Sequence, residues 1–418
     1  GIGVAANGAG VAGSVAYNTI DSNTLAYVDD STVIGDSIGI EAIDTSSIIA
    51  VGGSIAYGGK AGIGAGIAWN RISGGAVARL ARADVEATGD LIVSATDDSQ
   101  ITSVAAAIAV AFNQVEKEEP PEKSDKSNNS GDGGGEESEE EKNESAGGLA
   151  LAAGISINTI DTTTEAVIVH SGTSSKPLTA AKVELKATAE NSRITGVGGG
   201  IAVGVSLMKK PDSKGSASSL AAGASYVFNE INQNVYAKAS ENFWETVGPV
   251  IVHATSATDI HSLAIAGAVA VATGSKTSNK AFAGAGAVTV STIRGEVSSR
   301  VTDSTIATTA AGGVVEVVAN DKRTITADAG GVAIAIAQGS DSNAGNTSVA
   351  IGAAIAFNTL EDCVVAATVT DSSINGADAV TVTATSELDV DALSLAGALA
   401  AAVSGGKGGT ALAGAGAF

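Results

Sequence analysis

Hydrophobic and polar residues alternate along most of the chain. The clearest example is one stretch whose alternating runs cover 324–336, 348–357, 364–370 and 379–385. A period of two residues, rich in Val, Ile and Thr, is typical of β-strands. No stretch has the capped period of 3.6 residues that is typical of a long helix. The pattern therefore predicts an almost all-β chain.

A short motif recurs within these runs, in which an aromatic or branched residue precedes a fixed polar residue. Successive copies are about 60 residues apart, and a period of this size is typical of repeat architectures. The fixed positions are Asn18, Asn70, Asn158, Asn229, Ser291 and Asn358. Repeats of this kind bury their cores against their neighbours, so we expect stacked units and not separate domains.

We predict a repetitive β-solenoid built from units of about 60 residues, each with about four strands and projecting hairpin turns. The first two runs of a unit are expected to pair as a hairpin because their connection is short and variable. A tandem array of β-sandwiches is the alternative. The expected units are approximately 1–47, 48–100, 101–192, 193–259, 260–323, 324–389 and 390–418. Since the chain opens and closes inside a repeat, we expect a fragment of a longer polypeptide.

One connection is expanded into an acidic insertion at 116–146. It contains 12 Asp and Glu residues against 4 Lys, with few apolar residues. Such a composition cannot bury enough apolar surface to fold, so we expect a disordered loop at an exposed tip. The segment lacks the alternating oxygen ligands of a calcium-binding loop. We interpret it as a solvated spacer, with a partner-docking arm as the alternative.

Composition limits the interior and the partners. Aromatic residues make up 3% of the chain while Gly numbers 53, so the interior is expected to be narrow and filled with small side chains. The formal net charge of −22 argues against nucleic acid as a partner. The apolar runs are too short and too interrupted for a membrane-spanning helix. The single cysteine, Cys363, excludes an intrachain disulfide and is expected to be buried beside Val364.

The recurrent Asn predicts a structural ladder. In a stack of coils, equivalent residues lie about 4.8 Å apart, so an inward Asn can bond its copies above and below. A role in turn formation is the alternative, and Ser291 should weaken a ladder locally. The residue before it is expected to stack in the same way, with a carbohydrate-binding row as the functional alternative. These residues are Tyr17, Trp69, Ile157, Phe228, Val290 and Phe357.

Candidates for metal binding are few. Asp389 and Asp391 follow the fourth run of one unit, and the pair at 97–98 holds the corresponding place in another. Two carboxylates on one face can bind a cation such as Ca²⁺ or perform acid–base chemistry. Solvated corner residues that limit lateral association are the alternative. The three histidines, His170, His253 and His261, lack neighbours with metal-ligand spacing, so no cofactor other than calcium is considered.

Known catalytic motifs are absent from the sequence. It contains no nucleophile elbow, no Walker loop and no His-Glu-x-x-His motif. The Gly-x-Gly strings, as at 62–66 and 284–286, lie within predicted strands and are not followed by a helix, so they are not expected to bind phosphate. The chain is therefore expected not to be an enzyme.

The runs from Asp303 to Ala319 and from Asp371 to Ala384 read Asp-Ser-x-Ile followed by alternating Val, and Gly/Ala-alternating strands follow them. This pattern resembles the repeat regions of giant bacterial secreted adhesins, the filamentous-haemagglutinin-like exoproteins. The resemblance covers nearly the whole chain outside the insertion. It implies export to the cell surface and a role as shaft, fibre or adhesin.

Three functions follow from these expectations. The first is a non-catalytic extracellular structural segment that associates with itself into fibres or contacts cell-surface glycans. The second is a glycan- or cation-binding surface module, supported by the acidic corners. The third is a β-helix polysaccharide-degrading enzyme, which would need a unique carboxylate or Arg cluster that the sequence does not offer.

Overall fold

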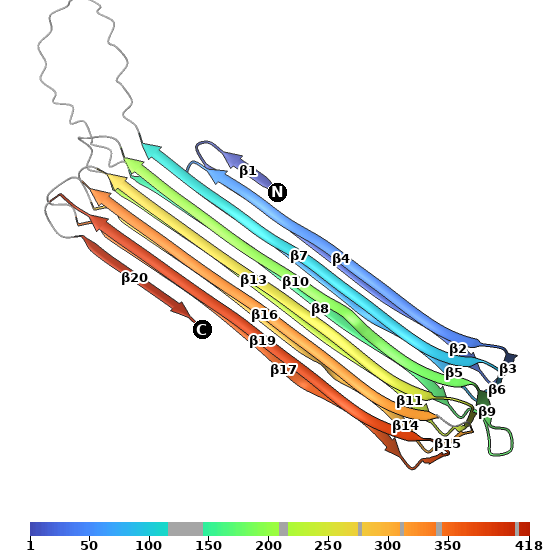
Figure 1. The fold of residues 1–418 in the computed structure, drawn as a ribbon. Helices are drawn as coiled ribbons and strands as arrows, with labels where there is room; N and C mark the ends of the chain where they lie inside the picture. The colour runs from blue at the N-terminus through green and yellow to red at the C-terminus, as the bar shows by residue number, and fades with distance from the viewer. Residues whose placement is uncertain (116–144, 209–215, 275–277, 310–312, 340–344, 406–408) are drawn as a thin grey trace, which may run out of the picture.

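The fold is a stack of parallel β-coils (Figure 1). In the computed structural model, the described residues are 1–115, 145–208, 216–274, 278–309, 313–339, 345–405 and 409–418. Within these ranges every regular element is a strand. The predicted all-β solenoid is thus confirmed, and continuous sheets of parallel strands replace the alternative of tandem sandwiches.

Three sheets make up the stack. Sheet A has the strands β1 (Ile2–Ala5), β4 (Ile38–Gly58), β7 (Asp90–Val115), β10 (Lys182–Met208), β13 (Val250–Gly274), β16 (Val314–Gly339) and β19 (Ala379–Val403). Sheet B has β2 (Ala9–Asp29), β5 (Ala61–Ala81), β8 (Ala146–Val169), β11 (Ala217–Ser240), β14 (Lys280–Thr302), β17 (Thr347–Thr370) and β20 (Thr410–Ala417). Sheet C has β3 (Thr32–Gly35), β6 (Asp84–Ala87), β9 (Leu178–Ala180), β12 (Phe243–Thr246), β15 (Thr305–Thr308) and β18 (Ser373–Asn375).

Each coil runs out along a strand of sheet A, returns along sheet B and turns through a short strand of sheet C. The number of strands in a unit is therefore three, where four were predicted. The second and third alternating runs of one unit are both part of β17, and its first run continues the fourth run of the preceding unit in β16. Apart from β1 and β20, the strands of sheets A and B have 21 to 27 residues, far longer than ordinary strands.

The predicted hairpin between the first two runs is wrong. β16 pairs with β13 and β19, whereas β17 pairs with β14 and β20, and all these pairings are parallel. The two runs face each other through their side chains, and their connection is an arch between sheets. Each strand finds its hydrogen-bond partner in the next coil because the same sequence pattern recurs there in register.

At the other end of each coil, the chain turns a corner from sheet B into sheet C. The recurrent Asp-Ser pair lies at this corner. The residue after each described sheet B strand that leads into sheet C has a positive φ, for instance 48° at Asp303 and 49° at Asp371. Asp tolerates this conformation better than most residues. The Ser304 hydroxyl then donates to the Thr302 carbonyl at 2.8 Å, and the Ser304 amide donates to the Ser372 hydroxyl at 3.1 Å.

The core differs between the two ends of the strands. The corner half, next to sheet C, is filled by Val, Ile, Leu and Ala together with Trp244. The arch half, next to the A-to-B connections, is filled almost entirely by alanine. A row of isoleucines lies between them. The narrow interior expected from the composition is found in the arch half. Of the predicted insertion 116–146, residues 116–144 lie outside the described residues.

Candidate functional site

The recurrent Asn residues lie in the middle of the sheet B strands and point into the core. Asn18 Nδ2 donates to Asn70 Oδ1 at 2.8 Å, and Asn70 donates to Asn158 at the same distance. Asn158 donates to Asn229 Oδ1 at 2.7 Å. The structure thus brings four of the six predicted ladder residues together in one line of amide hydrogen bonds across successive coils.

The line changes course at Ser291. Asn229 Nδ2 donates to the hydroxyl of Ser262 in sheet A at 2.7 Å, and this hydroxyl also bonds the Ser291 hydroxyl at 2.7 Å. A serine side chain is too short to reach the equivalent residue of the next coil along the stacking direction. Neither amide atom of Asn358 has a hydrogen-bond partner among the described residues, although both atoms are buried.

A layer of buried polar side chains crosses the core between the corner half and the isoleucine row. Its members are Asp44, Ser46, Asp97, Ser99, Thr162, Thr164, Ser192, Gln233, Ser256, Thr258, Asp321 and Arg323. Gln233 connects the two sheets, because it donates to Ser192 at 2.5 Å and accepts from Ser256 at 3.2 Å. Buried polar groups are costly unless they are bonded, and most members of this layer bond one another.

Two acidic residues of this layer occupy neighbouring coils. Asp44 accepts hydrogen bonds from Ser22, Thr24 and Ser46 at 2.7–3.0 Å. Asp97, in register with Asp44, accepts from Ser99 at 2.8 Å and is fully buried. Burial raises the pKa of the Asp97 carboxyl above its ordinary value, and the charge of Asp44 adds to this rise. Asp97 is thus not the solvated corner residue that was one interpretation of the pair at 97–98.

Farther along the stack, the same layer contains an ion pair. Arg323 Nε donates to Asp321 Oδ2 at 2.6 Å, and both side chains are almost completely buried. Arg323 also donates to the carbonyl of Gly295 at 2.8 Å and contacts the Cys363 sulfur at 2.9 Å. Gly295 lies at a register shift of β14 with a φ of 133°, a conformation that favours glycine. The bulge turns this carbonyl toward the guanidinium.

The predicted calcium candidates lie on the last long strand of sheet A. Asp389 and Asp391 face outward on β19, in register with Thr324 and Thr326 of β16. The charge of Asp389 acts on Lys322, whose ammonium lies 2.9 Å from Glu387. Within the described ranges, no three His, Cys, Asp or Glu residues are close enough together to hold a metal ion.

The histidines lie apart from one another. His170 occupies a corner with a φ of 51° and lies 2.5 Å from Glu241. His253 lies on the outer face of sheet A, 3.4 Å from Glu316, and partial burial lowers its pKa. His261 lies on the same face near Asp328. His170 and His253 each lie beside one glutamate, and among the described residues the three histidines belong to no common set of metal ligands.

The residues that precede the recurrent Asn form a row on the outer face of sheet B. The rings of Tyr17 and Trp69 meet edge to face with centroids 5.7 Å apart. Trp69 is 50% exposed and Phe357 is 57% exposed. The predicted stacking is therefore present on the outside of the coil, while the Asn ladder lies inside.

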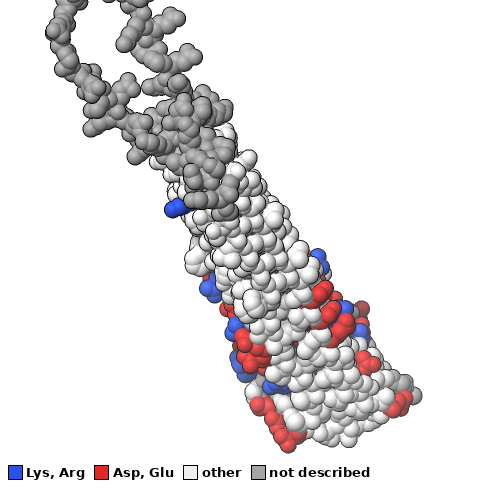
Figure 2. All heavy atoms as spheres, turned by 90° about the vertical axis from the view of Figure 1, so that its left-hand side faces the viewer, with Lys and Arg blue, Asp and Glu red and all other residues white. Residues whose placement is uncertain are grey.

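This aromatic row marks a boundary on the molecular surface. Toward the corners the outer faces carry charged residues, and toward the arches they carry almost none, as Figure 2 shows for the face it presents. In the arch half the outward residues are large and apolar, for example Ile201, Ile265 and Val332 on sheet A. This arrangement inverts the corner half, where the large apolar residues point inward.

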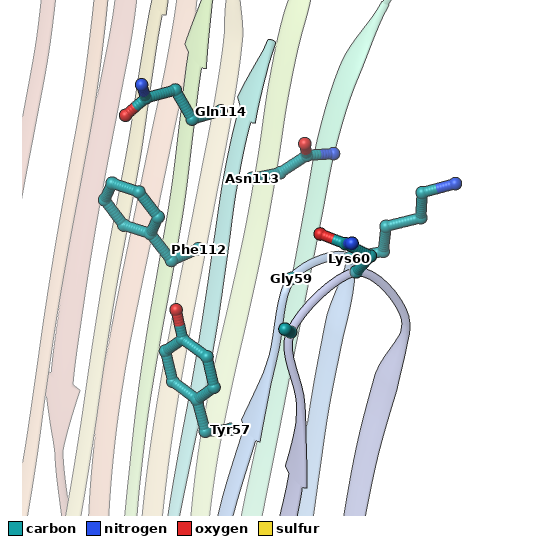
Figure 3. Close-up of a pocket in the computed structure, with 8 residues that line it drawn as sticks. Tyr57, Gly59, Lys60, Phe112, Asn113 and Gln114 are labelled. Carbon is teal, nitrogen blue, oxygen red and sulfur yellow. The ribbon is translucent and has the colours of Figure 1, made fainter.

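A shallow hollow of about 350 Å³ lies beside the arches, where the apolar surface ends (Figure 3). Tyr57 and Phe112 line its apolar side. Lys60, Asn113 and Gln114 line its polar side and lie closer to the arches. The hollow therefore marks a polar margin of the surface.

Comparison with protein-family descriptions, with curated proteins and with solved structures finds no match for this chain. In the part of the chain that the structure describes, no helix is long and apolar enough to cross a lipid bilayer.

Two features are not predicted from the sequence. They are the buried polar layer and the arch half, in which the large apolar residues point outward. The signal for the layer is a short polar cluster at inward positions, such as Asp321 and Arg323, between alternating runs. The signal for the inverted half is the separation of small residues from Ile, Leu and Val at alternate positions. Residues 201–207 have this separation without exception.

Proposed function

We propose that this chain is a non-catalytic structural segment, a shaft or fibre element of an exported surface protein. The observation that supports this function best is the amide line from Asn18 to Asn229. It uses equivalent positions of successive coils to fix their register and leaves no amide directed at a ligand. An enzyme or a binding module needs a unique site, whereas these amides recur at equivalent positions of successive coils.

The resemblance to secreted adhesin repeats supports export, and the acidic surface supports solubility outside the cell. The polar layer agrees with a structural function as well. Its charged members, Asp321 and Arg323, bond each other and the backbone in the closed core. The side chains of both residues are at most 1% exposed.

The test is an in-register duplication of the two central coils, 182–313, since Val183, Val250 and Val315 hold equivalent positions in successive coils. Added coils should lengthen the particle by about 4.8 Å each along the stacking direction and leave the strand direction unchanged. Small-angle scattering and electron microscopy measure both dimensions. Separate beads joined by a linker would contradict the proposal. So would the release of reducing ends from a polysaccharide panel, if a single substitution abolished that release.

A further inference from the structure

The arch half carries a belt of apolar side chains on both outer faces. We call this belt the apolar band and define it by Val197 to Val205 on β10 and Leu220 to Phe228 on β11, with the residues in register on the other strands of sheets A and B. Of the described residues that face outward in the band, Asp328 alone is charged, and it lies in the row next to the charged half.

The band has the same position on the two sheets. A Cβ atom at Gly198 of β10 would lie 2.8 Å from Val227 of β11, near one margin of the band. A Cβ at Gly204 would lie 3.0 Å from the Leu220 carbonyl, near the other margin. Both margins therefore coincide across the thickness of the molecule. Nine residues of extended strand span about 26 Å.

Inside the band the sheets contact each other through very small residues. A Cβ at Gly200 would lie 2.1 Å from the Ala224 carbonyl, and one at Gly223 would lie 2.2 Å from the Gly267 carbonyl. The surrounding buried residues are almost all alanine. The larger apolar side chains point outward, where Ile265 is 47% exposed and Ile351 is 56% exposed. Their burial requires an apolar medium outside the protein.

From these features we infer that the apolar band is a lipid-contacting belt that lies within the hydrocarbon core of a bilayer, with the strands running across it. The hydrocarbon core is about 30 Å thick and is crossed by strands of about 9–11 residues. The height of the band matches this thickness. The inference goes beyond the structural function proposed above and does not depend on it.

The margins of the band agree with this placement. Tyr and Trp are enriched where a membrane protein meets the lipid headgroups. Tyr17 and Trp69 lie at the charged margin, next to Arg71. Tyr57 and Phe112 lie near the arch margin, with Lys60 beyond them (Figure 3).

In the inner coils the backbone also satisfies the demand of a hydrocarbon medium, in which each amide and carbonyl needs a partner within the protein. Within the band, β10 pairs on one side with β7 and on the other with β13. β11 pairs likewise with β8 and β14. Inner coils therefore present only side chains to their surroundings.

A second copy of the chain is a weaker candidate for the same surface. A copy covers one face and leaves the other bare, whereas a bilayer covers both at once. A planar bilayer requires coincident margins on both faces, and the structure has them.

The test uses the whole chain, diluted from mild detergent into neutral phosphatidylcholine vesicles and floated on a density gradient. The chain should float with the vesicles. Ile265→Arg, inside the band on β13, should lower the floated fraction at least tenfold. Thr255→Arg, which faces outward on the same strand in the charged half, is the matched control and should float like the unchanged chain. Absence of flotation of the unchanged chain overturns the inference.

The depth of single tryptophans in the bilayer is measured by the quenching of their fluorescence, with lipids brominated at different positions of the acyl chain. Trp69 should be quenched best by bromine near the headgroups. A tryptophan placed by Ile201→Trp, in a chain with Trp69→Phe, should be quenched best by bromine near the bilayer centre. Trp244 is 1% exposed in the corner half and serves as the constant background. Equal quenching at all depths overturns the inference. A second result would assign the band to another copy of the chain. In that case the chain would not float, it would associate with itself without lipid, and Ile265→Arg would abolish this association.

Discussion

Asn158 and Asn229 are 71 residues apart in the chain, yet their side chains share a hydrogen bond of 2.7 Å in the core. Asn158 also accepts a bond of 2.8 Å from Asn70. The Asn158 amide is thus both donor and acceptor, so this one residue fixes its coil against the two neighbouring coils. A shift of one residue in register would turn every such amide outward and break the line.

Replacement of Asn158 by Ala should therefore destabilise the stack. It leaves the Asn70 donor and the Asn229 acceptor buried without partners, at a cost of about 1–3 kcal/mol for each unsatisfied group. Denaturant midpoints followed by circular dichroism measure the loss. Asn358→Ala is the matched control, because neither amide atom of Asn358 has a partner among the described residues. Equal losses in the two variants would contradict the structural role of the ladder.

The ion pair between Asp321 and Arg323 gives a second prediction. Arg323→Met leaves the Asp321 carboxylate buried without its cation, and removal of one partner of a buried pair costs about 3–5 kcal/mol. The variant should unfold at a clearly lower denaturant concentration.

The neighbouring coil supplies the control for this pair. In register with the pair it has Ser256 and Thr258, which are neutral. The double variant Asp321→Ser with Arg323→Thr copies that coil and should recover most of the lost stability. A double variant as unstable as Arg323→Met would show that the pair itself, and not an uncompensated charge, determines the effect.

The buried carboxyl of Asp97 predicts a dependence of stability on pH. Its pKa is raised, chiefly by burial, although hydrogen bonds from Ser99 and Thr162 oppose the rise. The folded chain therefore holds this proton at pH values where the unfolded chain has lost it. As pH rises above the ordinary value of 3.8, this group lowers stability until the raised pKa is passed, and the loss is then constant.

Asp97→Asn should remove this contribution. The amide keeps an oxygen for the Ser99 hydroxyl, so the variant should be more stable than the unchanged chain at pH 7 and show a smaller fall in stability between mildly acidic and neutral pH. Thermal unfolding across this range measures the change. Asp98→Asn, on the outward face, is the control and should keep most of the original pH dependence, because the charge of Asp98 is the smallest of the causes that raise the pKa of Asp97.

The sequence predicts the strands and the stacking because period-two alternation and a repeated motif are properties of the chain itself. It does not predict the number of strands, since inward polar residues interrupt the apolar alternation without ending a strand. Asn358 and Thr359 separate two apolar runs, yet both lie in the middle of β17. In each repeat, the four expected runs therefore belong to two long strands, one of sheet A and one of sheet B, and the short sheet C strand is the third strand.

The sequence also leaves open which face is inside. Alternation gives two equivalent faces, and only packing decides between them. In the corner half Val315 and Val317 point inward, whereas in the arch half Ala333 and Ala335 point inward and Ile334 points outward. The larger side chains point outward there because the opposing backbones contact each other at glycine positions. That contact depends on residues many positions apart in the chain.

The contact between the sheets gives the last prediction. Gly200→Ala places a methyl group where the Ala224 carbonyl lies 2.1 Å away, so the sheets must separate locally. Overpacking of this kind costs about 1–3 kcal/mol. The adjacent change Gly199→Ala is the matched control, because its methyl faces outward and meets only the Ala106 side chain at 3.8 Å. Both replace one glycine by alanine in the same strand, so they share the same change in the unfolded chain. Gly199→Ala should keep or slightly raise the unfolding midpoint, and Gly200→Ala should lower it. If both variants unfolded at the same midpoint, the sheets would be free to move apart, and the close contact would not determine which face of the arch half is buried.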